Sequence, residues 1–154
     1  MTLAEKLLPK LSEWQPAGSG RHSWSMDEAG WNIHLAADKA DSLSCLVWEL
    51  TLTRTAAAPA KLTMKQWAEA IAARVEGLRE DLKVYEVDSD VALLRSTDPH
   101  AKGESLAYYE VRLQGVERAV VRRFAASKSK PGREQVAFAL THEVLAGLAE
   151  GIAG

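Results

Sequence analysis

The sequence predicts an α+β fold, in which an antiparallel β-sheet packs against a crossing helix and a C-terminal helix. Segments with alternating apolar and polar residues recur along the chain between turn residues, which is typical of antiparallel strands. Two other segments, one near the middle and one at the C-terminal end, repeat apolar residues at helical spacing. Strands in two runs with a helix between them and a helix at the end are typical of this class.

The size and composition of the chain limit the classes of partner that it is expected to bind. The chain has 154 residues, 47% of them hydrophobic and 26% charged, so it has the length of one domain and an ordinary globular composition. Nineteen Lys and Arg residues against 21 Asp and Glu residues give a net charge of −2. The overall field therefore does not attract polyanions, and we expect no nucleic-acid partner and no membrane partner.

Two local features of the sequence predict the cellular compartment of the protein. Cys45 is the single cysteine, which excludes an intrachain disulfide and fits a reducing environment. Charges and Pro9 interrupt the first residues before an apolar run of signal-peptide length forms. The sequence therefore predicts a cytoplasmic location.

Two parts are expected along the chain. Residues 2–14 carry leucines at spacings of three and four, which predicts a short helix around Pro9. Residues 15–20 combine proline, glycine and serine and mark a connector. We therefore divide the chain into an N-terminal helix and connector, residues 1–20, and a single α+β domain, residues 21–154.

The first strands are predicted from alternation. A loop at residues 27–30 pairs Trp24 with Ile33 in a hairpin, and a polar loop at 36–42 separates this hairpin from a strand at 44–54. On that strand Trp48 shares a face with three leucines. Because each lies on the apolar face of its own element, four tryptophans are expected in one core: Trp24, Trp31, Trp48 and Trp67.

The middle of the chain begins with a helix. Thr63 and Gln66 have the spacing of a capping box and predict that a helix starts there. Strands at 82–87 and 91–96 follow, joined by a polar turn. A strand at 105–113 then leads to a tight turn at residues 114 and 115.

That turn sets a register that conflicts with the apolar pattern. It places Arg118 opposite Val111 and puts Arg122 on the same face. The conflict indicates a bulge, a sheet edge or a polar site within an otherwise apolar face.

The C-terminal segment has two interpretations. Residues 134–141 alternate in polarity, which favours a strand that returns beside the preceding one, although a continuous helix from Arg133 also fits. In the first interpretation Thr141 caps a final helix.

The element order resembles the PsbP-like fold, including its bacterial DcrB-like relatives. The resemblance covers about Trp24 to Ile152 and rests on Trp31 in an early strand and on the segments 50–54, 63–67, 106–109 and 139–141. Members of this group generally act as binding or assembly modules, so the resemblance implies a noncatalytic role. Exported members carry signal or lipoprotein segments that this sequence does not show.

No catalytic, cofactor-binding or metal-binding residues are predicted. The four histidines lack the spacing of a metal site, and neither a nucleophile elbow nor a phosphate loop is present. The clearest charge feature is basic. It comprises Arg118, Arg122, Arg123, Lys128, Lys130 and Arg133.

This basic group suggests a site for an acidic protein surface, or else a solvated hairpin that protects a sheet edge. RNA binding is disfavoured, because Phe124 is the one aromatic residue among these basic residues. We therefore expect a noncatalytic protein-binding or chaperone-like module without a cofactor, for which a homodimer is one option. The alternatives are a small enzyme with a dispersed active site and a protein similar to type III secretion chaperones.

Overall fold

The computed structural model describes the whole chain, from Met1 to Gly154. It contains three helices and ten strands. In chain order they are α1 (Leu3–Glu13), β1 (His22–Glu28), β2 (Trp31–Ala40), β3 (Ser44–Arg54), α2 (Met64–Arg74), β4 (Leu82–Val87), β5 (Val91–Ser96), β6 (His100–Lys102), β7 (Ser105–Gln114), β8 (Arg118–Ser127), β9 (Arg133–Val136), β10 (Phe138–Thr141) and α3 (His142–Ala153).

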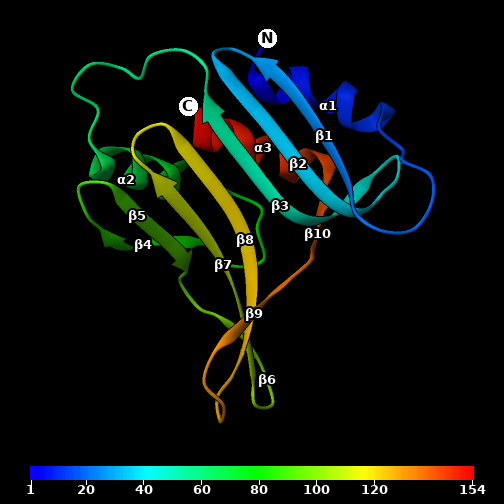
Figure 1. Cartoon of the computed structure of the whole chain (residues 1–154), viewed down its shortest axis with the longest axis vertical. Coiled ribbons are helices and arrows are strands. Elements are labelled where there is room, and N and C mark those ends of the chain that lie inside the picture. The colour runs from blue at the N-terminus through cyan, green and yellow to red at the C-terminus, as the bar shows by residue number, and fades with distance from the viewer.

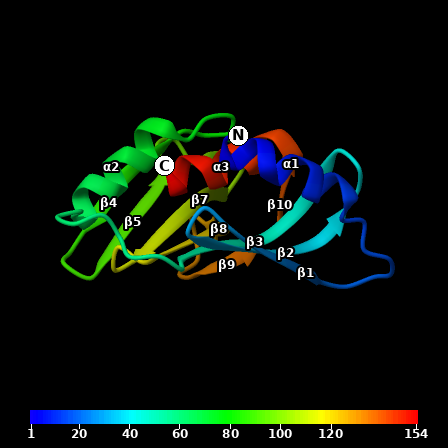
Figure 2. The same cartoon turned by 90° about the horizontal axis from the view of Figure 1, so that it is seen from above.

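The strands form one antiparallel sheet, which confirms the predicted α+β class (Figure 1). Its main path runs β1-β2-β3-β8-β7-β5-β4, and β10, β6 and β9 add to β3, β7 and β8 respectively. Figure 2 shows all three helices on one side of the sheet. We call this side the covered face and the opposite side the uncovered face.

The N-terminal helix is part of the main core. Leu3, Leu7 and Leu11 of α1 are buried in the same hydrophobic cluster as the sheet and the other helices. Thr2 and Glu5 form a capping box at the start of α1, which continues through Pro9. None of the three helices combines the length and apolarity of a membrane-spanning helix.

The first hairpin has the predicted faces but a tighter turn. Its loop has two residues, Ala29 and Gly30, both with positive φ angles. Trp24 therefore pairs with Leu35, not with Ile33 as predicted. The register differs by two residues, so each side chain keeps its predicted face. The predicted loop at 36–42 is also wrong in part, because β2 continues to Ala40.

A β-bulge in β3 turns Trp48 away from the core. Ala36 and Ala37 are consecutive in β2, and they pair with Glu49 and Val47 of β3. Trp48 lies between Val47 and Glu49 and has no partner on β2. The extra residue reverses the alternation of side chains, so Val47 and Leu50 are both buried although they are three positions apart.

Three of the four tryptophans predicted in the core contact it, and one does not. Trp31 and Trp67 are buried together, with ring centroids 6.0 Å apart, and Trp24 is partly buried against the same core. Trp48 lies outside this cluster, with the Arg21 guanidinium 3.7 Å above its ring. The predicted place of Trp48 in the core is therefore wrong.

The β7–β8 hairpin has a three-residue loop, 115–117, instead of the predicted two-residue turn. Val111 pairs with Val121, not with Arg118, so the predicted register is wrong by three residues. An odd shift exchanges the two faces of a strand. Arg118 therefore lies on the uncovered face, whereas Arg123 lies on the covered face beneath the helices.

The C-terminal segment is a strand, and the continuous helix is wrong. The strand breaks at Ala137, because β9 pairs with β8 whereas β10 pairs with β3. Thr141 caps α3 as predicted, and its hydroxyl accepts a hydrogen bond from the Val144 amide. The predicted capping box at the start of α2 and the hairpin of β4 and β5 are confirmed as well.

Candidate functional site

The structure distributes the six predicted basic residues over three places. Three lie on the uncovered face, one is buried on the covered face, and two lie near the end of a projecting arm formed by residues 100–106 and 126–133 (Figure 1). They are, in that order, Arg118, Arg122 and Arg133, then Arg123, then Lys128 and Lys130. The six residues therefore do not form one surface.

Neighbouring strands extend the group on the uncovered face. Five arginines lie there on β5, β7, β8 and β9, whereas β3 and β7 contribute two glutamates. The arginines are Arg95, Arg112, Arg118, Arg122 and Arg133, which we call the arginine face; the glutamates are Glu49 and Glu110. Arg95 and Arg112 were not predicted as part of this group, because they lie on strands distant in sequence from the other basic residues.

Charges alternate in a row across this face. Arg95, Glu110, Arg122 and Glu49 lie side by side on four neighbouring strands. The Arg95 and Glu110 side chains are 3.2 Å apart, and those of Arg122 and Glu49 are 2.9 Å apart. Glu110 is buried, and Arg133 donates a second hydrogen bond to it at 2.7 Å. This bond raises the pKa of Arg133 above its usual value, so its positive charge is permanent.

Two of these arginines form cation–π contacts with aromatic rings. The Arg133 guanidinium lies 3.7 Å from the ring centroid of Phe124, and the Arg95 guanidinium lies 4.2 Å from that of Tyr85 and 5.4 Å from that of Tyr108. Such contacts restrict the arginine side chains and cover the ring faces. One face of each ring is therefore covered by a guanidinium, and Tyr85 is still 57% exposed.

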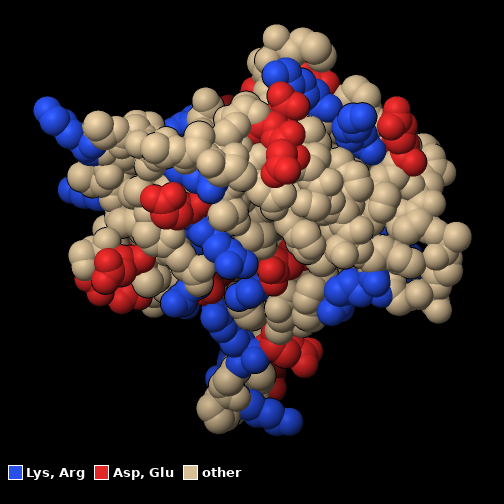
Figure 3. Space-filling model, turned by 45° about the horizontal axis from the view of Figure 1, so that its top comes forward, with Lys and Arg blue, Asp and Glu red and all other residues tan.

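Two arginines of the face form no ion pair. Arg112 is partly exposed, Arg118 is exposed, and neither has a carboxylate within salt-bridge distance. Because Arg112 pairs with Val120, it lies diagonally across from Arg118. On the face seen in Figure 3, basic and acidic side chains are mixed, and basic side chains are also present on the arm. The unpaired positive charge of the arginine face is centred on these two side chains.

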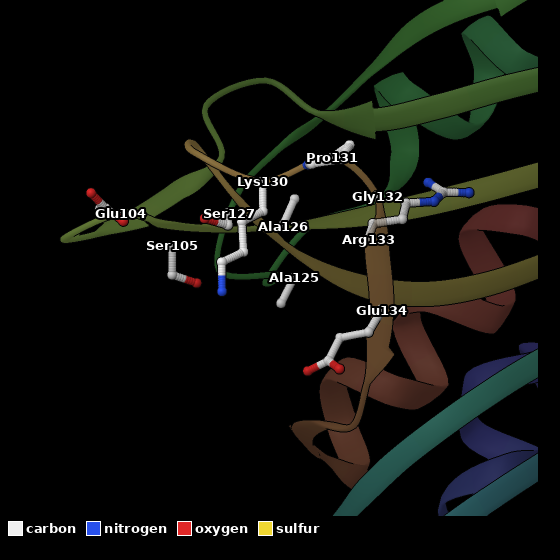
Figure 4. Close-up of a pocket in the computed structure, with 10 residues that line it drawn as sticks. All are labelled: Glu104, Ser105, Ala125, Ala126, Ser127, Lys130, Pro131, Gly132, Arg133 and Glu134. Atoms are coloured by element: carbon white, nitrogen blue, oxygen red, sulfur yellow. The ribbon is translucent and has the colours of Figure 1, made fainter.

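The arm carries a hollow of about 650 Å³. Its lining mixes charges, with Glu104 and Glu134 beside Lys130 and Arg133. Figure 4 shows Arg133 turned away from Lys130, and its contacts are with Glu110 and Phe124 instead. The polar groups do not converge on one point, so the hollow has no evident ligand.

The covered face contains a buried polar cluster around Arg123. Both terminal nitrogens of Arg123 bind the Glu80 carboxylate, at 2.9 and 3.2 Å. The Ser96 hydroxyl donates to Glu80 at 2.8 Å and accepts the Tyr109 amide at 2.8 Å. The conflict predicted for Arg118 and Arg122 arose from the wrong register, and the charged residue that β8 places on the covered face is Arg123. Its partner Glu80 lies between α2 and β4, where no sequence pattern identified it.

A cleft of about 490 Å³ adjoins this cluster. Tyr109 and Arg123 line it together with Phe138, Leu140 and Val144. Burial raises the pKa of Tyr109, so its hydroxyl is protonated at neutral pH. Glu80 neutralises Arg123, and Arg79, which also lines the cleft, leaves one positive charge in excess.

The titratable groups near Cys45 do not form a nucleophilic site. Burial raises the pKa of the Cys45 thiol to about 11, which keeps it protonated and unreactive at neutral pH. Asp41 accepts the amides of Leu43 and Ser44 and so stabilises a turn. No three His, Cys, Asp or Glu side chains gather as metal ligands.

The chain was compared with protein-family models, with curated proteins and with solved structures, and no match was found in any of the three.

Proposed function

We propose that the protein is a noncatalytic binding module whose arginine face holds an acidic surface of another protein. The observation that carries this proposal is the pair of unpaired arginines, Arg112 and Arg118, on a sheet face that no helix covers. An acidic partner supplies the carboxylates that these two side chains lack, and Arg side chains bind carboxylates through two parallel hydrogen bonds.

The surrounding contacts favour a protein partner over nucleic acid. Base stacking needs free aromatic faces beside the basic groups. Phe124 is buried, and the Arg133 guanidinium covers its ring. The net charge of −2 also opposes a long polyanion, whereas a local acidic patch interacts with the arginine face alone.

The proposal agrees with the PsbP-like resemblance, which implies a binding or assembly role, and we place the protein in the cytoplasm of a bacterium on the same sequence grounds. Lys128 and Lys130 extend basic charge along the arm and form a second, separate part of the proposed contact.

The test is affinity capture from cytoplasmic extract with the partner read by mass spectrometry. Arg112→Glu with Arg118→Glu should abolish capture, whereas Lys61→Glu with Lys65→Glu should retain it. Both double substitutions change the net charge equally. The control residues are exposed; Lys61 precedes α2 and Lys65 lies in its first turn, and α2 packs on the covered face. Capture by the wild type should also weaken as salt is raised.

Two results contradict the proposal. Equal capture by both double variants excludes the arginine face as the binding surface. Recovery of RNA at physiological salt, with a steep dependence on salt, shows that the partner class is wrong.

A further inference from the structure

The outer edge of β1 is an unpaired strand edge. β1 pairs with β2 through all seven of its residues, without a bulge, and no strand lies on its other side. Ser23, Ser25 and Asp27 alternate along it and are exposed. A long regular edge of this kind is a template for pairing with another strand.

The hairpin turn determines which backbone groups point outward. Glu28 and Trp31 flank a two-residue loop, so they form a pair that exchanges hydrogen bonds. The bonded residues of β1 then alternate, and the amide and carbonyl groups of Ser23, Ser25 and Asp27 point away from β2. None of these groups has a hydrogen-bond partner within the chain.

These three residues are spaced symmetrically. An antiparallel copy of β1 with its two-fold axis at Ser25 places Ser25 opposite Ser25 and Ser23 opposite Asp27. About six backbone hydrogen bonds form in this register, because all the outward groups find partners. In a register shifted by one residue, these outward groups would oppose residues whose own amide and carbonyl groups point back toward β2.

In the same register, the side chains of the two β1 strands that oppose each other are compatible in polarity and charge. Trp24 opposes Met26 of the second copy, and both are only partly buried in a single chain. Glu28 opposes His22, and Asp27 opposes Ser23, so no two like charges meet across the axis. The apolar pair lies on the covered face, where the exposed part of Trp24 gains a neighbour.

The other end of the sheet is protected against such pairing. β4 has an irregular register between Val84 and Glu86 and carries Lys83 on its exposed side. Bulges and lysines are the usual devices that prevent an edge from adding a strand. β1 has neither a bulge nor a lysine, so the two edges differ in the property that decides pairing.

We infer that the protein forms a symmetric homodimer through antiparallel pairing of β1 with β1 of a second copy, centred on Ser25. The two sheets then continue into one another. Because opposed residues share a face, both arginine faces lie on the same side of the joined sheet. This inference does not depend on the proposed function.

A cysteine crosslink tests the register. Opposed residues of a hydrogen-bonded antiparallel pair lie about 5.5 Å apart, within reach of a disulfide. Ser25→Cys should form a disulfide-linked dimer under mild oxidation, whereas Ser89→Cys, in the exposed β4–β5 turn, should remain monomeric. Cys45 is buried and does not compete. Equal crosslinking of the two variants, or none, overturns the inference.

The mass in solution tests the edge independently. The wild type should have twice the 16.8 kDa mass of the chain by light scattering. Ser25→Lys brings two lysines together at the axis and should give a monomer with an unchanged circular dichroism spectrum, because Ser25 is exposed. A monomeric wild type, or a Ser25→Lys variant that stays dimeric, overturns the inference.

Discussion

Arg123 and Glu80 form a bidentate ion pair in which each side chain is only 7% exposed. They join β8 to the segment between α2 and β4. The Arg123 guanidinium also lies 4.2 Å from the ring centroid of Tyr109. The pair therefore fixes the connection between α2 and β4 to the sheet through buried polar contacts.

Glu80→Gln should lower the free energy of unfolding by about 3 kcal/mol, because it leaves the Arg123 charge buried without a counterion. Denaturant unfolding measures the loss. Asp38→Asn breaks the more exposed Arg21–Asp38 pair and is the matched control, with an expected loss below about 1 kcal/mol. Similar losses in the two variants would show that burial does not set the cost of breaking this pair.

Trp67→Ala should cost about 3–5 kcal/mol, since it opens a cavity in the core and removes the indole hydrogen bond to the Ile152 carbonyl. Trp48→Ala should cost only about 1 kcal/mol, because Trp48 packs outside the core beneath Arg21. Chemical unfolding compares the two variants. Equal losses would place Trp48 in the core after all.

The Cys45 thiol should make the fold sensitive to alkali. Its pKa rises from an ordinary value of 9.0 to about 11 on folding, so the unfolded chain loses the thiol proton first. The stabilisation is complete below pH 9 and disappears as the pH rises toward 11. The stability of the wild type should therefore fall more steeply than that of Cys45→Ala between these values.

A second measurement checks the same thiol. The native protein should react with a thiol reagent at pH 8 far more slowly than the unfolded protein does, because Cys45 is buried and protonated. Equal rates in the two states would contradict the raised pKa.

The β1–β2 turn offers a stabilising substitution. Ala29 has a φ angle of 53°, a conformation that suits Asn before Gly in a two-residue hairpin loop. Ala29→Asn should raise the free energy of unfolding by about 1 kcal/mol. Gly30→Ala should lower it, because Gly30 also has a positive φ and an added Cβ would lie 3.2 Å from Ala56. A loss of stability in Ala29→Asn would contradict the strain at Ala29.

Local patterns predicted most elements. The capping box of Thr63 and Gln66 identified the start of α2, and alternation identified β3, β4 and β5. The polar turn before Arg133 correctly favoured a strand over a helix in the segment that follows. These signals depend on residues close in sequence, so one sequence contains them in full.

The pairing register between neighbouring strands was harder to predict than the strands themselves, because it depends on the length of the connecting loop. The turn after β1 was predicted two residues too long, an even error that left every side chain on its correct face. The turn after β7 was predicted to end too early, and the odd shift moved Arg118 and Arg123 to the wrong faces. The bulge at Trp48 had the same effect, because one extra residue reverses the alternation.

The sequence by itself determined the fold class, the order of the elements and the presence of excess basic charge late in the chain. Only the tertiary structure decided which charges act together. Arg95 and Arg112 join Arg122 through pairing between strands distant in sequence, and Glu80 neutralises Arg123 from a segment without a periodic pattern. Periodicity reports the face of a residue within its own element, whereas its neighbours across the sheet depend on loops and bulges that a change of one residue alters.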